Sequence, residues 1–232
     1  PRRSLAAVAA AFVLSACALF HKRGDFQAVR TLSQQPAHGR SGLVLLLSPP
    51  NIRLEQQADG GFRVGPAVLG GTDLLADIEA LGAVRWSWQQ FLRALRPHQE
   101  TLKHVYLIGS RDIPGPPGGP DSPGSYASLA DAERLIRAYV PPGAVIHRVR
   151  CAVDFQSLRE LQECVAGAVS LLLAQGLRKE DVLVDVTGGQ KTASIAGALI
   201  TLNSNVTFQY VQTNWPFDTL EYDLEIRSSS LV

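Results

Sequence analysis

Short apolar runs alternate with helix-length segments along most of this chain, and the alternation limits the fold more than any other feature. The expected strands are Leu43–Leu47, Lys103–Ile108, Val145–Val153, Val182–Val186 and Thr207–Gln212. The expected helices are Thr72–Leu81, Ser87–Leu95, Ala127–Tyr139, Phe155–Gln175 and Ala193–Leu202. Strands that alternate with helices of these lengths predict an α/β fold with a Rossmann-like, doubly wound, mostly parallel sheet.

Less regular segments fill the gaps in this pattern. Ile52–Gln57 and Phe62–Val64 predict a small hairpin, and Pro114–Ser125 is rich in Pro and Gly, which predicts an exposed loop. Leu220–Ile226 predicts an antiparallel edge strand. We expect residues 24–41 to form a polar linker with a short helix at most, and residues 42–232 to form one ligand-binding domain.

The junction between the fourth strand and its helix carries the clearest chemical signal. The segment Asp185-Val186-Thr187-Gly188-Gly189-Gln190-Lys191-Thr192 ends a buried strand in a Gly pair and opens a helix. The first N–H groups of a helix lack partners, and the helix dipole favours negative charge there. Lys191 adds a positive charge, and Thr187 and Thr192 add hydroxyl groups. The junction therefore predicts a site for an anion, most simply a phosphate group.

Two other interpretations of the junction stay open. A Gly pair also solves a tight strand–helix turn sterically, although Lys191 in the first turn opposes the dipole unless an anion is bound. A P-loop requires Gly where this chain has Gln190, which disfavours nucleotide hydrolysis. Asp185 either accepts hydrogen bonds from the turn, which we favour, or contacts a ribose or adenine.

Ligands of doubly wound sheets bind beyond the carboxyl ends of the strands, which defines the candidate residues. They are Ser48, Asn51, Gly109, Ser110, Asp185, Thr187, Gly188, Gly189, Gln190, Lys191 and Thr192. Trp215, which follows the fifth strand, either stacks on a base or packs at an interface, and packing is the commoner role.

Composition narrows the class of ligand. The formal net charge of +1 provides no general attraction for long nucleic acids, so a small molecule is favoured. No His or Cys residues have the spacing of metal ligands, and we expect neither a metal nor a cofactor. The three cysteines, Cys17, Cys151 and Cys164, lack a CxxC spacing, which indicates unlinked thiols in a reducing compartment.

The N-terminal segment Leu5–Phe20 carries no charge and lies between basic residues. About 16 residues at 1.5 Å each reach ~24 Å, which is short of the ~30 Å thickness of a bilayer core. We expect residues 1–23 to form a transmembrane helix in a bacterial inner membrane, with Lys22 and Arg23 placing the following domain in the cytoplasm. A lipoprotein signal ending at Cys17 and a buried core helix are the alternatives.

The residues Asp185, Thr187, Gly188, Gly189 and Lys191 match a motif of the CARF (CRISPR-associated Rossmann fold) domains, Asp-x-Thr/Ser-Gly-Gly-x-Lys between a strand and a helix. The chain resembles this family in strand–helix order over residues 42–228. The resemblance implies a homodimer in which two such motifs face one pocket for cyclic oligoadenylate, made during a type III CRISPR response. Ser48 and Asn51 occupy the place of the family's first ligand-contacting loop.

CARF proteins usually carry an effector in the same chain. The pattern Arg93-x4-His98 matches the letters of a HEPN ribonuclease, but Pro97 interrupts the helix, so we interpret it as coincidence. The apolar N-terminus is similar to that of membrane-anchored CARF effectors. The expected function is that of a membrane-anchored sensor in antiviral defence, and we do not expect it to be an enzyme. Binding of cyclic oligoadenylate would gate an oligomeric membrane assembly. Among these rings, we expect cyclic tetra-adenylate to be the ligand.

Two alternatives remain from the sequence. One is a ring nuclease that cleaves the same ligand slowly and without metal, by positioning a ribose hydroxyl for in-line attack. The other is a periplasmic lipoprotein with a Rossmann-like anion-binding domain.

Overall fold

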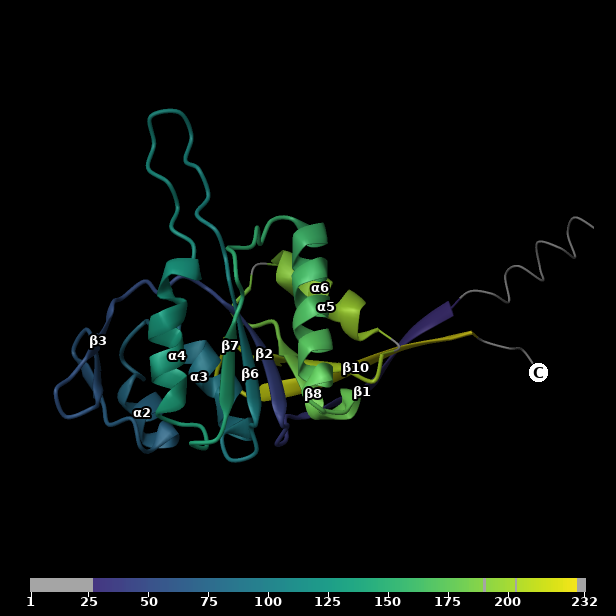
Figure 1. The fold of residues 1–232 in the computed structure, drawn as a ribbon, viewed down its shortest axis with the longest axis horizontal. Helices are drawn as coiled ribbons and strands as arrows, with labels where there is room; N and C mark the ends of the chain where they lie inside the picture. The colour runs from purple at the N-terminus through teal and green to yellow at the C-terminus, as the bar shows by residue number, and fades with distance from the viewer. Residues whose placement is uncertain (1–26, 190, 203, 229–232) are drawn as a thin grey trace, which may run out of the picture.

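The computed structural model describes residues 27–189, 191–202 and 204–228. Its centre is a seven-stranded sheet in the order β1-β10-β9-β8-β2-β6-β7 (Figure 1). The strands are β1 (Gln27–Pro36), β2 (Gly42–Leu47), β6 (His104–Gly109), β7 (Val145–Arg148), β8 (Val182–Asp185), β9 (Thr207–Val211) and β10 (Thr219–Ser228). The five from β9 to β7 are parallel, and β10 and β1 are antiparallel additions.

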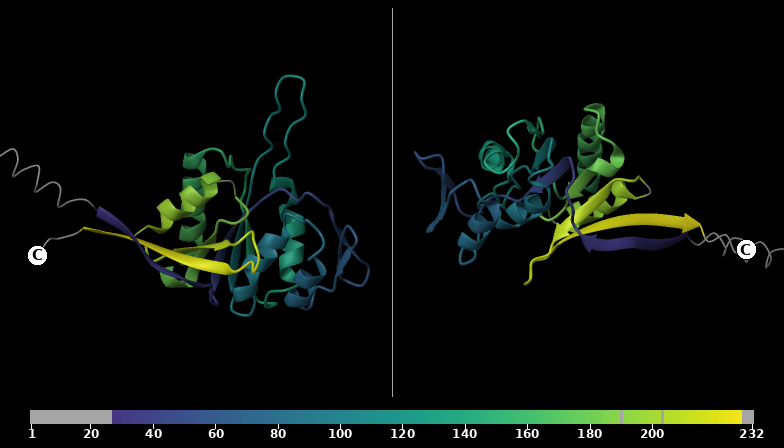
Figure 2. Two further views of the ribbon diagram at one scale, coloured as in Figure 1. Left: turned by 180° about the vertical axis from the view of Figure 1, so that it is seen from behind. Right: turned by 90° about the horizontal axis from the view of Figure 1, so that it is seen from below.

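Helices cover both faces of the parallel part, as the buried sequences of its strands require. Every residue of β2 and β8 is buried, which is the pattern of strands packed on both sides. The view from below shows α5 (Leu158–Ala174) and α6 (Lys191–Thr201) on one side of the sheet, and α3 (Gln89–Leu95) and α4 (Leu129–Arg137) on the other (Figure 2). The sheet is therefore doubly wound.

The order of the parallel strands is that of Rossmann-like sheets. Numbered along the chain, β7-β6-β2-β8-β9 reads 3-2-1-4-5. Between β2 and α3, the chain forms a second, three-stranded sheet of β3 (Leu54–Gln56), β4 (Phe62–Val64) and β5 (Ala67–Leu69), followed by α2 (Leu74–Ala80). The predicted hairpin is thus extended by one strand.

The predicted strands and helices of the parallel part are confirmed, but the antiparallel edge differs from the prediction. The segment expected to be a linker contains β1, which pairs along its length with β10. β10 is therefore an inner strand, and β1 forms the edge. The sequence of β1, QAVRTLSQQP, contains no long apolar run. An edge strand can form its backbone hydrogen bonds without being buried on both faces, so the sequence pattern did not indicate this strand. β7 is also shorter than predicted and ends at Arg148.

The Pro- and Gly-rich segment forms a long arm that projects from the sheet between β6 and α4 (Figures 1 and 2). Ile113 and Ser122 exchange two backbone hydrogen bonds of 2.9 Å across the arm. The prediction of an exposed loop is confirmed.

None of the helices within the described ranges has both the length and the hydropathy to cross a bilayer. The predicted transmembrane helix at residues 1–23 lies outside those ranges, so it stays a prediction.

Candidate functional site

The crevice of a doubly wound sheet opens where the chain leaves two neighbouring strands in opposite directions. In this sheet those strands are β2, which leads to β6, and β8, which leads to β9. Ser48 follows β2, and the turn Thr187-Gly188-Gly189 follows β8. The structure therefore brings these predicted residues together at the one edge where such folds bind ligands.

Both glycines of the turn are required by close contacts. A Cβ on Gly188 would lie 2.1 Å from the carbonyl oxygen of Leu46, and one on Gly189 would lie 2.0 Å from the Cβ of Ala193. The Ser48 hydroxyl donates a hydrogen bond of 2.7 Å to the Gly188 carbonyl oxygen. The turn is therefore fixed against the end of β2, and α6 begins directly behind it.

Asp185 lies beneath the turn and is hydrogen-bonded to it. Its side chain is fully buried; Oδ1 accepts from the Thr187 N–H at 3.1 Å, and Oδ2 accepts from the Thr187 hydroxyl and from Gln209 Nε2, each at 3.0 Å. Burial raises the pKa of Asp185 to about 7, and the hydrogen bonds from Gln209 and Thr187 act in the opposite direction. These hydrogen bonds fit the structural role favoured above, and a contact with a ribose or adenine stays a prediction.

A buried chain of hydrogen bonds extends from Asp185 into the core. Gln209 donates through Nε2 to Asp185 and to the Ala94 carbonyl oxygen, and its Oε1 lies 2.7 Å from His98 Nε2. The Arg40 N–H donates to His98 Nδ1 at 3.1 Å, so the proton of a neutral imidazole lies on Nε2 and points at Gln209. Burial lowers the pKa of His98, which keeps the ring neutral.

The hydrogen bonds within the turn shift the predicted anion site from the turn itself to the first residues of α6. The Thr187 N–H and hydroxyl are engaged by Asp185, and the Gly189 N–H faces the Val186 carbonyl oxygen at 3.4 Å. The donors that remain belong to the start of α6, where the first N–H groups have no acceptor within the helix. Lys191, which is exposed, and Thr192, which is half-buried, lie there. Gln190 is outside the described residues.

Gly109 and Ser110 pack against the base of the arm. A Cβ on Gly109 would lie 2.7 Å from the Tyr126 Cα. Ser110 exchanges hydrogen bonds with Ser125: its N–H donates to Ser125 Oγ at 2.8 Å, and the Ser125 N–H donates to Ser110 Oγ at 3.0 Å. The Ser125 hydroxyl then donates to the Leu47 carbonyl oxygen at 2.6 Å. The pair closes the base of the arm through these hydrogen bonds.

Asn51 is likewise used internally. Its Oδ1 accepts from the Ser87 N–H at 2.8 Å, and its Nδ2 donates to the Arg85 carbonyl oxygen at 2.7 Å. Asn51 thus fastens the loop after β2 to the segment before α3, and the ligand contact stays a prediction. The Trp88 indole N–H supports the same loop by donating to the Ser48 carbonyl oxygen at 2.8 Å.

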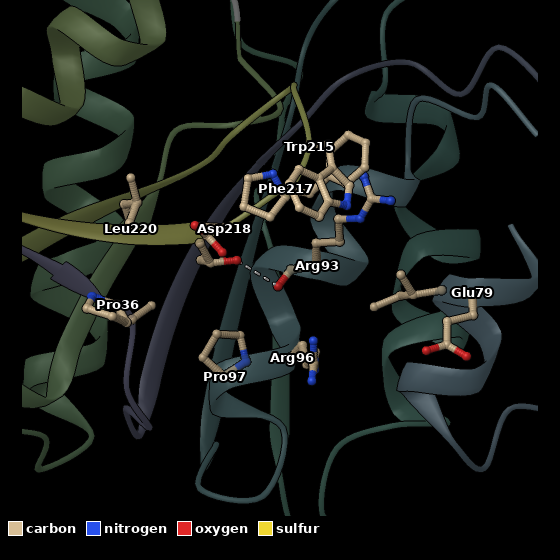
Figure 3. Close-up of a pocket in the computed structure, with 13 residues that line it drawn as sticks. Pro36, Glu79, Arg93, Arg96, Pro97, Trp215, Phe217, Asp218 and Leu220 are labelled. Atoms are coloured by element: carbon tan, nitrogen blue, oxygen red, sulfur yellow. Dashed lines mark hydrogen bonds between the residues drawn. The ribbon is translucent and has the colours of Figure 1, made fainter. Parts of the chain in front are cut away.

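A groove with a volume of about 770 Å³ lies between α3 and the loop from β9 to β10 (Figure 3). Its lining includes Arg93, Arg96, Trp215, Phe217 and Asp218, and none of the predicted ligand-binding residues. Sequence reasoning missed it because its walls come from distant segments; the only signal was Trp215, a large apolar residue placed after a strand. His98, next to this wall, is fully buried, which agrees with the interpretation of the Arg93-x4-His98 pattern as coincidence.

No family model matches the chain. An uncharacterized protein of Aquifex aeolicus (strain VF5) is 33% identical over 131 residues, which is 56% of this chain and 39% of that protein. The chain therefore spans well under half the length of this relative.

Proposed function

We propose that this chain is a sensor whose α/β domain is a CARF domain and binds cyclic oligoadenylate in type III CRISPR antiviral defence. The observation that carries the proposal is the position of the start of α6. The fit of Gly188 against Leu46 and the Ser48–Gly188 hydrogen bond hold it at the crevice between β2 and β8. The Rossmann-like strand order and the Asp-x-Thr-Gly-Gly-x-Lys motif support the same conclusion.

The chemistry of this position suits a phosphodiester. Lys191 offers an ammonium group, Thr192 a hydroxyl, and the first amides of α6 offer N–H groups backed by the helix dipole. Each linkage of a cyclic oligoadenylate carries one negative charge, so a ring presents several anions spaced around its rim. One chain would neutralise part of the ring, and a second copy would take the rest.

We therefore include a homodimer in the proposal. Ile195 and Leu199, one turn apart on α6, are 52% and 47% exposed. If this face packs on its counterpart, the two starts of α6 flank a two-fold axis. Rings with an even number of nucleotides, tetra-adenylate above all, match that symmetry.

The membrane part of the proposal concerns the segment before β1. The apolar residues 5–20 would anchor the chain in the inner membrane with the domain in the cytoplasm, and β1 joins that segment to the sheet through β10. Ligand binding would gate an oligomeric assembly only if the ring binds its two states with different affinity.

Calorimetric titration of the full chain in detergent with cyclic tetra- and hexa-adenylate tests the proposal. We expect saturation at one ring per two chains, and recovery of the ring intact, as a sensor requires. Lys191→Ala should weaken binding by about 1.5–3 kcal/mol, the size of a lost charge-assisted contact.

The matched control is Lys179→Ala, since this exposed lysine lies before β8, at the opposite edge of the sheet. The control should bind as the unmodified chain does. Absence of heat with both rings, from protein shown to be folded, would contradict the proposal.

A further inference from the structure

The groove between α3 and the loop from β9 to β10 has the size of a small-molecule site. Its volume of about 770 Å³ falls in the range of ~300–1,000 Å³ typical of ligand pockets. In the close-up, Arg93 rises from α3 toward the rings of Trp215 and Phe217, and Arg96 lies farther along the same wall (Figure 3).

Trp215 is presented to solvent at the mouth of this groove. It is 85% exposed, whereas Trp86 and Trp88 are 3% and 1% exposed. A single exposed apolar side chain is ordinary on a protein surface, so Trp215 alone indicates nothing. Trp215 becomes informative because the loop that carries it is fixed by contacts with α3.

The loop is fixed in a conformation that costs free energy. Phe217 has a φ of +62°, in the left-handed region that bulky residues avoid. The Arg93 guanidinium lies 3.9 Å from the centroid of the Phe217 ring, and the Phe217 N–H donates to the Asn214 carbonyl oxygen at 2.8 Å. The loop is thereby attached to α3, and it carries Trp215 beside a cation.

The charges of the groove favour a ligand that combines a ring with an anion. Neither Arg93 nor Arg96 takes part in an ion pair with any residue whose side chain the structure describes. Glu79 and Asp218 also line the groove and reduce its attraction for a highly charged anion. A ligand with one phosphate, in which a planar ring supplies most of the contact, fits both observations.

We propose that this groove binds a nucleoside monophosphate, with the base stacked on Trp215 beside the Arg93 guanidinium and the phosphate paired with Arg96 farther along the same wall. This second nucleotide site goes beyond the function proposed above and does not depend on it, because it shares no residue with the start of α6. Indole rings stack on any base, so the site selects for a nucleotide rather than for a particular base.

Calorimetric titration of the full chain with AMP, adenosine and inorganic phosphate, in parallel, tests the proposal. We expect AMP to bind, adenosine to bind at least fivefold more weakly, and phosphate to give no measurable heat. Trp215→Ala should lower the affinity for AMP about tenfold or more, and Trp215→Phe, which keeps a ring, should restore part of it. Because Trp215 is exposed, both variants should keep the thermal midpoint of the unmodified chain.

Further variants separate this site from the other surfaces. Arg96→Ala should weaken AMP binding severalfold, and Arg159→Ala, an exposed arginine on α5, should leave it unchanged. Lys191→Ala should also leave AMP binding unchanged, even where it weakens binding of a cyclic ring, so that the two proposals fail or hold separately.

Three results would overturn the proposal. The first is absence of AMP binding by the folded, unmodified chain. The second is AMP binding that survives Trp215→Ala but is lost in Lys191→Ala, which would place the nucleotide at α6. The third is a change in oligomeric mass, measured by light scattering, on Trp215→Ala with no change in AMP affinity; the groove would then belong to a contact between copies of the chain.

Discussion

Asp185 is a buried acidic group next to the turn that precedes α6. All of its hydrogen-bond partners are donors, and the nearest of them, Thr187, belongs to the turn that precedes α6. The orientation of Gln209 is fixed in turn by the neutral His98 ring. The side chain therefore holds the turn in place from the protein interior.

The raised pKa of Asp185 predicts a pH dependence of stability with a definite sign. The folded chain holds this proton up to a pH of about 7, whereas the unfolded chain releases it near 3.8. Folding thus favours the protonated form, and the contribution of Asp185 to stability, greatest at low pH, is lost as the pH rises from about 4 to about 7.

Asp185→Asn removes this titration, so the variant should lose more stability relative to the unmodified chain at pH 5 than at pH 8. Urea unfolding at both values measures the difference, and comparison at equal pH cancels the histidine titrations shared by both proteins. A larger loss at pH 8 than at pH 5 would mean that the turn stabilises the anion, and the proposed preference of the folded chain for the protonated carboxyl would be wrong.

At the scale of elements, the contact between the turn and β2 sets where α6 begins. A Cβ on Gly188 meets the backbone of Leu46, which cannot move aside without disturbing the centre of the sheet. Gly188→Ala should therefore lower the free energy of unfolding by about 1–3 kcal/mol, the usual cost of overpacking, and should weaken ligand binding as α6 shifts.

The matched control is Gly167→Ala in the middle of α5, where a Cβ would meet nothing within 4 Å. Alanine is the better helix former, so this variant should be equal to the unmodified chain or up to ~1 kcal/mol more stable. Equal effects of the two substitutions in denaturant unfolding would show that the contact with Leu46 is not what fixes the turn.

The strands buried on both faces were the easiest to predict from the sequence, and the edge strand β1 was not predicted. The runs Leu43–Leu47 and Val182–Val186 indicate β2 and β8 because burial on two sides demands continuous apolar residues. β1 has no such demand, and its pairing with β10 depends on segments far apart in the chain, as the register of Gln27 with Ser228 shows. Periodicity within one segment cannot reveal such a pairing.

The same limit applies to the candidate site. The predicted strand ends indicated that Ser48, Thr187 and Gly188 lie beyond the carboxyl ends of the parallel strands, as the structure has them. The sequence does not show which polar side chains form hydrogen bonds within the fold. Asn51 and Ser110 lie at that edge and form hydrogen bonds within the fold, Asn51 with Ser87 and Arg85 and Ser110 with Ser125. These partners are contributed by other loops, so only the three-dimensional arrangement identifies them.

For the whole molecule, the proposed two-fold axis rests on the exposed face of α6. Ile195→Glu combined with Leu199→Glu should convert a dimer into monomers, because four carboxylates would face one another across the axis. Light scattering measures the mass, and calorimetry should show that affinity for cyclic tetra-adenylate falls together with dimerisation.

Val68→Glu provides the control, since Val68 is 54% exposed but lies on the small sheet, away from α6. This variant should change neither mass nor affinity. A double α6 variant that stays dimeric and binds normally would place the interface on another face.

The most direct measurement of the central claim is a spectrum of the chain labelled with ¹⁵N at lysine and threonine, recorded during addition of cyclic tetra-adenylate. We expect the amides of Lys191 and Thr192 to shift first and furthest, while the Lys179 amide stays in place. Saturation of the ring's binding with the Lys191 and Thr192 amides unmoved would contradict a nucleotide site at the start of α6.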